Sequence, residues 1–478
     1  MAPLLISLPQ QLSSPIPENY RKTPSELEIL VRSGLTSTDA NGILTGVDMP
    51  ALAFAASHAL GLTEIPAVSL FKKGGFNKLF CLEFSLAKRK VLARIPHKLD
   101  QPSPRVDSSV ATSCFAHYVR DIPTPQIFAW NANQDPKNNL VRVPYILLEC
   151  LEDVVEAWKG WPTSQATDRF EEAHVLLREL ALLYSKLLEP LPASLQGVGD
   201  LVFAPRIDAD SDLSDPKNYA LRPLKLHTAS ETAFSASTTS LDTLWDELWL
   251  HYRQLYLPEP GVEINLMAFL ALTSVPGDAR EDAGAFMAAA KDARAFAQAA
   301  MRKLAQHPTY AEPVLFPSDF AFRNILIDRE TRRVRAIVDW DDVYVMPFVI
   351  GVAYPKDILE FCLLGLTPDA QYFKDGCFEE FPPDEYGDIT EDKDGTLVYL
   401  DENLESPGIA ERNERIFHTA CRETFAGVLR RCDARVGDPE MWELRRAVLK
   451  AYRLMMSGGF EWWGKRVWLA EQTKERAS

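Results

Sequence analysis

Two apolar runs around a short polar segment, between Leu315 and Asp342, constrain the fold of this chain more than any other feature. The stretch reads LFPSDFAFRNILIDRETRRVRAIVDWDD, and its apolar runs have the length and composition of β-strands. Asp319 follows the first run, Asn324 comes five residues later, and Asp339 ends a further apolar run. A carboxylate at a strand end can accept a proton from a substrate hydroxyl, and carboxylate and amide oxygens suit Mg²⁺. The spacing therefore favours metal-assisted phosphoryl transfer.

The composition indicates a soluble globular protein. The chain has 478 residues, 46% of them hydrophobic and 25% charged, which suggests about two to four structural units. Its formal net charge of −16 argues against nucleic-acid binding, because phosphate contacts need clustered Lys and Arg. An acidic surface would also be repelled by anionic membranes, so we expect neither nucleic acid nor membrane as a partner.

The cysteine pattern points to a reducing compartment. The seven cysteines are scattered and form no CxxC pair, which favours free thiols over a zinc site or a disulfide framework. The N-terminal MAPLLISLPQQLSSP lacks a basic flank and has three prolines, so it is interpreted as a tail rather than a signal peptide. No apolar run is long enough to cross a bilayer. We therefore expect a cytoplasmic protein.

The chain changes texture along its length, and the pattern predicts an α+β fold. Residues 1–65 are interpreted as a helical extension and 66–148 as a small antiparallel sheet with one helix. The predicted strands are VSLF, KLFCLEF, KVLARI, TPQIFAW and PYILLEC, and the predicted helix is SSVATSCFAHYVR. Residues 149–478 are mainly amphipathic helices. They contain the polar segment at 315–342 and an acidic insertion at about 366–407.

The motif at 315–342 resembles a known family. PSDFAFRNILID and RAIVDWDD are similar to the catalytic and metal-binding segments of the aminoglycoside phosphotransferase and choline kinase-like branch of the protein-kinase superfamily, including its fungal-type phosphotransferases. The resemblance implies a two-lobed protein-kinase-like fold that uses ATP and Mg²⁺. It also implies that Asp319 is the catalytic base and that Asn324 and Asp339 are Mg²⁺ ligands.

The N-terminal segments resemble the nucleotide-binding lobe of the same family. KKGGFNKLFCLEF is similar to the hairpin that covers the phosphates, where small residues let backbone amides approach oxygen atoms. Four residues lie near its tip: Gly74, Gly75, Phe76 and Asn77. VLARIP places Arg94 at the position of the family's phosphate-contacting basic residue. PYILLECLE resembles the hinge, so Glu149 to Leu151 are expected to present backbone groups to adenine.

Two positions depart from the family pattern. Pro317 replaces the usual histidine before the catalytic aspartate, and Ser109 replaces the helix glutamate that would hold the basic side chain. Asp107 lies two residues upstream of Ser109, and residues at that spacing point to different helix faces. The sequence thus leaves Arg94 without an evident acidic partner. Asp341 and Asp342 could extend the metal shell, but they are interpreted as a solvated acidic turn.

Alternatives to a kinase remain open. Asp319 can cap a turn, Asn324 can bond its own backbone, and Arg94 can be a solvated strand charge. The main interpretation is an ATP- and Mg²⁺-dependent small-molecule kinase that phosphorylates a hydroxyl. The rivals are a pseudokinase-like binding or scaffold protein and a kinase fold reused for other metabolite chemistry. The acidic composition favours a cationic or amine-bearing acceptor, while the acceptor's identity and the oligomeric state are left undetermined.

Overall fold

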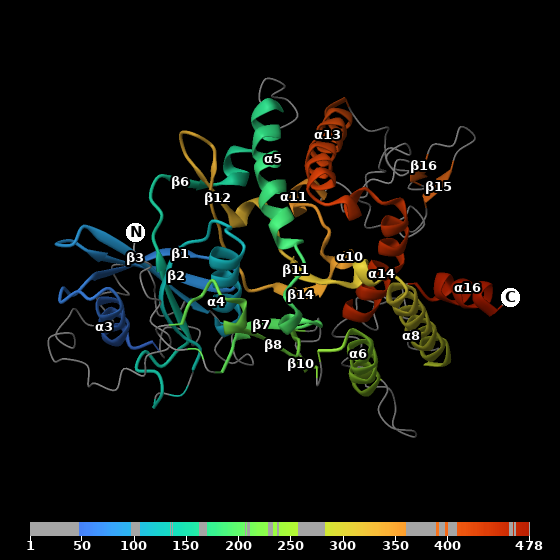
Figure 1. Ribbon diagram of the computed structural model, residues 1–478, viewed down its shortest axis with the longest axis horizontal. Helices are drawn as coiled ribbons and strands as arrows, with labels where there is room; N and C mark the ends of the chain where they lie inside the picture. Colours follow the sequence, from blue (N-terminus) through green and yellow to red (C-terminus); the bar gives the residue numbers. More distant parts are fainter. Residues whose placement is uncertain are drawn as a thin grey trace. The chain divides into compact units, whose positions relative to one another are not determined.

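The computed structural model describes residues 47–96, 106–133, 135, 137–161, 170–205, 207, 211–227, 233–236, 239–256, 283–359, 389–391, 397–399, 409–457, 462 and 465–477 (Figure 1). The chain divides into two compact units, each assembled from separate parts of the sequence. The first unit combines Met1–Glu156, Leu201–Ala220 and Asn324–Asp342. The second unit combines Ala157–Asp200, Leu221–Arg323 and Val343–Ser478.

The first unit contains a five-stranded antiparallel sheet in the order β1-β2-β3-β5-β4. Its strands are β1 (Ala67–Lys73), β2 (Asn77–Phe84), β3 (Arg89–Pro96), β4 (Ile127–Asn131) and β5 (Tyr145–Glu149). Helix α4 (Val106–Cys114) and the π-helical turn η2 (Phe115–Val119) connect β3 to β4. All five predicted strands and the predicted helix are present, and the α+β class is confirmed.

Helix α3 (Met49–Ala59) shares a hydrophobic core with this sheet. The helix begins after Asp48, whose side chain accepts a hydrogen bond from the Ala51 N–H at 3.0 Å and so stabilises the N-terminus. Leu52 of α3 and Phe80 and Phe84 of β2 are fully buried in the shared core, and each such side chain contributes about 1.5–3 kcal/mol. The helix predicted from PALAFAASHALGL is therefore integral to the first unit, whereas residues 1–46 lie outside the described part.

A second, three-stranded sheet carries the C-terminal half of the polar motif. β6 (Val154–Glu156), β12 (Ile325–Asp328) and β13 (Val334–Ile337) pair in the order β13-β12-β6. Asp328 closes the β12–β13 turn because its Oδ1 accepts hydrogen bonds from the N–H groups of Glu330 and Thr331 at 3.1 and 2.8 Å. The strand–turn–strand pattern of ILIDRETRRVRAI is thus observed.

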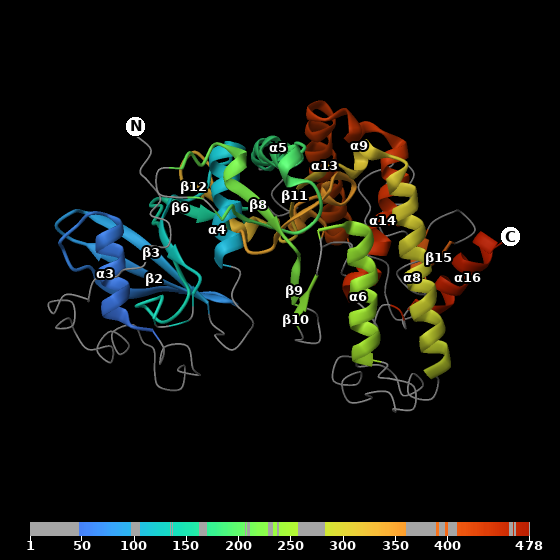
Figure 2. The same cartoon turned by 60° about the horizontal axis from the view of Figure 1, so that its bottom comes forward.

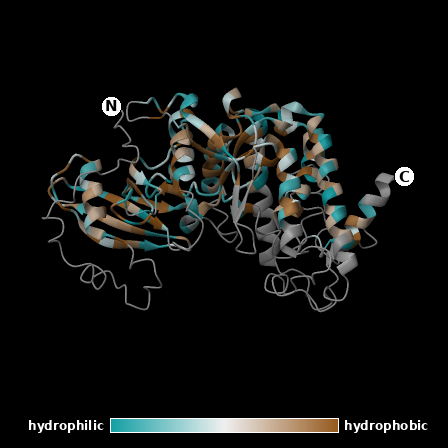
Figure 3. Ribbon diagram, turned by 90° about the horizontal axis from the view of Figure 1, so that it is seen from below, coloured by the Kyte–Doolittle hydropathy of each residue, from teal (hydrophilic) through white to brown (hydrophobic). Residues whose placement is uncertain are grey.

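The second unit is mainly helical. Its longer helices are α5 (Phe170–Leu187), α6 (Leu241–Tyr256), α8 (Ala283–Ala305), α13 (Ile409–Cys432), α14 (Pro439–Ser457) and α16 (Arg466–Ala477). α5 packs against α13, and α8 packs against α14 and α16 (Figure 2). The parts of these helices that are coloured in Figure 3 carry both hydrophobic and hydrophilic residues, as amphipathic helices do.

Short elements complete the described structure. β11 (Pro313–Pro317) pairs with β14 (Val343–Pro347) in the second unit, and its end leads to Asp319. The other paired strands are β7 (Asp200–Phe203) with β8 (Tyr219–Arg222), β9 (Lys225–His227) with β10 (Ala233–Ser235), and β15 (Ile389–Glu391) with β16 (Leu397–Tyr399). The short helices are η3 (Ala157–Gly160), η5 (Ala193–Leu195), η6 (Pro216–Asn218), α9 (Pro308–Ala311), η8 (Phe322–Asn324), α10 (Phe348–Gly351), α11 (Lys356–Leu359) and η11 (Ala434–Gly437).

The boundaries of the two compact units differ from those of the segments predicted at 66–148 and 149–478, because each unit combines stretches from separate parts of the chain. β12 and β13 come late in the sequence but belong to the first unit, because β12 pairs with β6. Strand pairing joins residues far apart in the chain, which a change in composition does not reveal. Of the insertion predicted at 366–407, only β15 and β16 fall among the described residues.

Two global expectations can be compared with the described residues. Within them, no helix is both long enough and apolar enough to span a membrane. The five cysteines in the described ranges are free thiols: Cys81, Cys114, Cys150, Cys421 and Cys432.

Candidate active site

The predicted phosphate-covering hairpin is the turn between β1 and β2. The Gly74 N–H donates to the Asn77 carbonyl at 2.9 Å and closes the turn. A Cβ at Gly74 would lie 3.2 Å from that carbonyl oxygen, whereas Gly75 has open space around it. Phe76 is strongly exposed. Gly74, Gly75 and Phe76 therefore form a tight, solvent-facing tip, Asn77 is half-buried beside it, and the contact of these residues with phosphate stays a prediction.

Arg94 lies on β3 and forms ion pairs with two aspartates that follow β13. Its Nη1 donates to Oδ1 of Asp341 at 2.8 Å, and its Nη2 donates to Oδ2 of the same carboxylate. Nη2 also lies 3.2 Å from Oδ1 of Asp339. The Arg94 side chain is only 13% exposed and that of Asp341 is 32% exposed. The guanidinium is thus held by a two-pronged pair, the stronger geometry for arginine and carboxylate.

Two neutral side chains complete this cluster. With the Asn77 amide oriented so that Oδ1 faces Arg94, that oxygen accepts from Nη2 at 2.7 Å and from Nε at 3.3 Å. The Ser109 hydroxyl on α4 lies 3.4 Å from Nη1. Burial by itself raises the pKa of Asp341, but Arg94 and hydrogen bonds from Ser109 and Asn77 outweigh it, so the pKa is lowered. We call these five side chains the Arg94 cluster: Asn77, Arg94, Ser109, Asp339 and Asp341.

This cluster corrects two expectations drawn from the sequence. Arg94 does have an acidic partner, and Asp341 is part of a half-buried ion pair rather than a solvated turn. The two residues are 247 positions apart, so no local pattern could join them. The one available signal was the acidic density of DWDD directly after an apolar strand.

The two predicted Mg²⁺ ligands lie at the same end of the β12–β13 hairpin. Asn324 directly precedes β12, and its carbonyl accepts a hydrogen bond from the Val338 N–H at 2.8 Å. Asp339 follows Val338 directly. Its backbone is left-handed, with a φ of 64°, which is uncommon for a residue other than glycine. Trp340 is buried, and its Nε1 donates to the Ile337 carbonyl at 3.0 Å. The hairpin therefore brings Asn324 and Asp339 together.

The predicted hinge follows β5. The Glu149 N–H donates to the Gln126 carbonyl at 2.8 Å, and Glu149 Oε2 accepts from the Gln126 N–H at 3.2 Å. The backbone N–H of Glu149 is therefore engaged inside the sheet. The backbone groups left to contact adenine, as the sequence predicts, are the carbonyl of Glu149 and those of Leu151, which lies after the end of β5.

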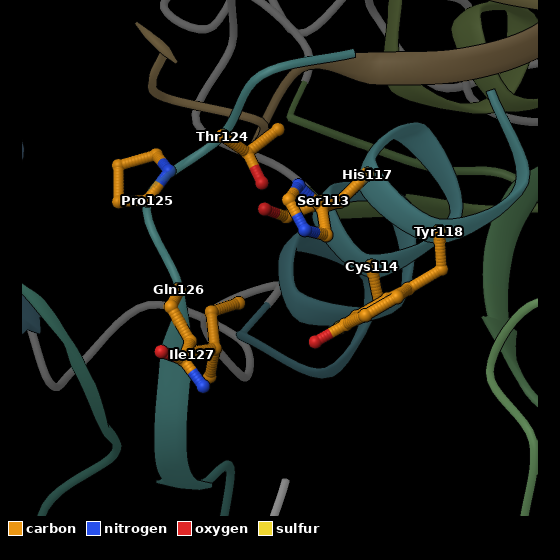
Figure 4. A pocket seen from close by; sticks show the side chains of 8 residues that line it. All are labelled: Ser113, Cys114, His117, Tyr118, Thr124, Pro125, Gln126 and Ile127. Carbon is orange, nitrogen blue, oxygen red and sulfur yellow. The ribbon is translucent and has the colours of Figure 1, made fainter. Parts of the chain in front are cut away.

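A separate, small pocket opens beside the end of α4 (Figure 4). It is lined by Ser113, Cys114, His117 and Tyr118 on one side and by residues 124–127 on the other. Burial raises the pKa of both Cys114 and Tyr118, so these groups are neutral at pH 7. None of the predicted site residues lines this pocket.

Asp319 lies in the second unit, in the turn after β11. Nη2 of Arg323 donates to Oδ1 and Oδ2 at 2.5 and 2.7 Å, and Nζ of Lys356 donates to Oδ1 at 2.7 Å. Burial raises the pKa of Asp319, but hydrogen bonds and charge from Lys356 and Arg323 outweigh it and the pKa is lowered. Asp319 is therefore held ionised between two cations.

The sequence interpretation missed both of these cations. Arg323 is four residues from Asp319 and reaches it within the loop, while Lys356 comes from α11. The loop is fixed to that segment because the Lys356 N–H donates to the Phe320 carbonyl at 2.8 Å and the Phe322 N–H donates to Asp357 Oδ2 at 2.6 Å. The FRN sequence could have indicated Arg323, but nothing local indicated Lys356.

The donor set at the hairpin end suits Mg²⁺ in chemical type. Asn324 supplies an amide oxygen and Asp339 a carboxylate, and Mg²⁺ commonly binds through one or two carboxylates together with substrate phosphates and water. Across the described ranges, no group of three or more His, Cys, Asp or Glu side chains is placed to hold a metal ion. A dedicated all-protein metal cage is therefore absent from that part of the chain.

Comparisons with curated proteins give distant relatives. No family model matches the chain. It is 31% identical over 133 residues to altered inheritance of mitochondria protein 9, mitochondrial, of Lodderomyces elongisporus, a match that covers 27% of this chain and 20% of that protein. It is 23% identical over 318 residues to a subtelomeric hrmA-associated cluster protein of Aspergillus fumigatus, covering 61% of this chain and 60% of that protein. The matched part of the chain thus spans about a fifth of the length of the Lodderomyces protein and about three fifths of the length of the Aspergillus protein.

Two solved structures have a chain trace that partly matches this one. A Ralstonia eutropha protein described as an aminoglycoside phosphotransferase is 13% identical, with a TM-score of 0.38 over 88% of this chain and 99% of that chain. Plasmodium vivax ethanolamine kinase is 11% identical, with a TM-score of 0.36 over 95% of this chain and 97% of that chain.

Proposed function

We propose that this protein is an ATP- and Mg²⁺-dependent phosphotransferase that acts on a hydroxyl group of a small molecule. The observation that carries the proposal is the β12–β13 hairpin, which brings Asn324 and Asp339 to one end while Arg94 contacts Asp339. Two oxygen ligands beside a cation suit a metal–phosphate group. The motif order in the sequence supports the same reaction.

Each residue has a distinct role in this proposal. Asn324 and Asp339 would hold Mg²⁺, which would supply positive charge to neutralise the nucleotide phosphates. Arg94 supplies a donor to a phosphate oxygen through Nη2, because a guanidinium forms charge-assisted hydrogen bonds with oxyanions. The residues at the hairpin tip supply backbone amides.

Asp319 orients the acceptor hydroxyl and takes up its proton. Its lowered pKa keeps it ionised at neutral pH, so it is ready to accept a hydrogen bond from the hydroxyl. A carboxylate with a low pKa is a weak base, so it receives the proton late, as the hydroxyl oxygen bonds to the γ-phosphorus of ATP, the bond from that phosphorus to the bridging oxygen breaks, and ADP leaves. Arg323 and Lys356 offset its charge and hold its orientation.

The proposed acceptor is a small molecule that carries a hydroxyl and an amine or another cationic group. The formal net charge of −16 favours the approach of cations, although net charge concerns steering more than identity.

Phosphoryl transfer can be tested with purified protein, ATP, MgCl₂ and a panel of hydroxylated amines. We expect a nucleotide- and Mg²⁺-dependent rise in melting temperature and an acceptor whose mass increases by one phosphate. Asp339→Ala should abolish the transfer, while Asp328→Asn in the β12–β13 turn serves as the control. Transfer by Asp339→Ala at the wild-type rate would contradict the proposal.

A protein that binds nucleotide without transferring phosphate is the second candidate. It is favoured by Asp319, whose two oxygens already accept from Arg323 and Lys356. Such a protein would show the shift in melting temperature without a phosphorylated product, and Asp319→Asn would leave nucleotide binding unchanged. A product detected with wild type and lost with Asp319→Asn excludes this alternative.

A further inference from the structure

We propose that Asp341, supported by Ser109, is the positioning residue that orients the Arg94 guanidinium toward the nucleotide phosphates. The inference rests on the proposed function and adds to it a residue outside the predicted catalytic and metal-binding set. It starts from the two-pronged pair in which both carboxylate oxygens of Asp341 accept from Arg94.

The pair fixes the plane of the guanidinium. A single hydrogen bond lets an arginine side chain swing, whereas two parallel hydrogen bonds to one carboxylate define both direction and rotation. Arg94 is almost buried on β3, so the orientation set by Asp341 is kept by its surroundings. The remaining donors of Arg94 are then directed at Asn77, Ser109 and Asp339.

The partners of Arg94 differ in how readily a ligand could replace them. Asp341 contributes two oxygens and is itself supported by Ser109 and Asn77. Asp339 contributes one oxygen at 3.2 Å, and its side chain is the more exposed of the two aspartates. A phosphate oxygen would therefore take the place of Asp339 at Nη2, while Asp341 stays in contact and holds the fork in position.

Ser109 is suited to support this arrangement. It is buried on α4, and its hydroxyl lies 3.4 Å from Nη1 of Arg94. The hydroxyl also donates a hydrogen bond to the Asp341 carboxylate. Because the serine side chain is small and neutral, it leaves room for the Asp341 carboxylate beside Arg94. The acidic partner of Arg94 therefore comes from the segment after β13 and not from α4.

Nucleotide binding by charge-matched variants tests the role of Asp341. Asp341→Asn removes the charge that holds Arg94, and Asp342→Asn makes the same change at the exposed neighbouring residue. We expect the first variant to weaken binding of a fluorescent ADP analogue about tenfold or more and the second by less than about twofold. The ATP KM should rise more than kcat falls. Wild-type affinity in Asp341→Asn would overturn the inference.

Exchanging two side chains separates positioning from simple stabilisation. Asp341→Ser alone should lose nucleotide affinity, and adding Ser109→Asp should restore at least half of the loss in log Kd, because the carboxylate returns to the guanidinium from the helix side. No recovery, although the double variant melts at the wild-type temperature, would count against positioning. Asp341→Glu keeps the charge and replaces Asp341→Asn should that variant not fold.

Arginine-selective modification reports on Arg94 without any nucleotide. The extent of phenylglyoxal labelling of the Arg94 peptide, measured by mass spectrometry, should rise several-fold in Asp341→Asn and stay at the wild-type level in Asp342→Asn. Wild-type protein that binds no nucleotide would overturn the proposed function and this inference together. Wild-type protein that binds nucleotide, with labelling and affinity unchanged in Asp341→Asn, would overturn this inference alone.

Discussion

Two carboxylates in this protein are each held by cations, but their surroundings differ. In the first unit, Asp341 pairs with Arg94, which is 13% exposed and far away in the sequence. In the second unit, Asp319 pairs with Arg323 and Lys356, whose side chains are 51% and 45% exposed. Exposed pairs contribute about 0–1 kcal/mol to stability, whereas breaking a buried pair costs about 3–5 kcal/mol.

The difference suggests a division of labour. The Arg94 cluster joins β2, β3, α4 and the segment after β13, so it links distant parts of the first unit. The Asp319 pair is built from solvent-facing cations that can turn toward a ligand at low cost. We infer that the first pairing mainly fixes structure and orientation, and that the second mainly prepares a carboxylate for chemistry.

The largest expected effect is on activity at Asp319. Asp319→Asn should lower kcat for phosphoryl transfer by about 100-fold or more, because the amide cannot take up the proton of the acceptor. Its free energy of unfolding should change by less than about 1 kcal/mol. Steady-state kinetics and urea denaturation measure the two quantities. An inactive variant that has also lost several kcal/mol would remove the contrast with Arg94.

The next effect is on stability at Arg94. Arg94→Met should lower the free energy of unfolding by about 2–3 kcal/mol, which is below the fully buried range because Asp341 keeps some contact with water. Lys90→Met on the same strand is the control, since the Lys90–Glu152 pair is exposed and should contribute less than about 1 kcal/mol. If Arg94→Met and Lys90→Met lost the same free energy of unfolding, the difference in burial between the two ion pairs would not matter for stability.

A smaller effect should appear in acid. The pKa of Asp319 is lowered in the folded protein, so its contribution to stability is present above the unfolded pKa of about 4. That contribution is lost as the pH falls through the lower folded pKa. Lys356→Met removes one cause of the lowering, so the stability difference from wild type should shrink between pH 6 and pH 3. A difference that grows in acid would reverse the assigned sign.

The smallest expected effect is that of salt. Raising NaCl from about 0.05 to 1 M shortens the screening length to about 3 Å. It should reduce the stability difference between Lys356→Met and wild type by up to about 0.5 kcal/mol and leave the larger difference for Arg94→Met nearly intact. Urea denaturation at both salt concentrations checks this, and a strongly salt-sensitive Arg94→Met difference would place that pair in the exposed class.

The sequence by itself determined the local elements. Short apolar runs with the composition of strands predicted β1 to β5, and Gly74-Gly75 marked the tight turn between β1 and β2. The register of the β12–β13 hairpin brings Asn324 next to Asp339. These features depend on neighbours within a few residues, which is the range that periodicity and turn chemistry report.

Only the tertiary structure decided which charges meet. Arg94 finds Asp341 across 247 positions, Lys356 reaches Asp319 from α11, and α3 packs into the core of the sheet. An ion pair leaves no periodic trace in the sequence, because any of many acidic residues could be the partner of a given arginine. Strand pairing and burial select one of them, since a charge removed from water must be met by the carboxylate that folding brings within reach.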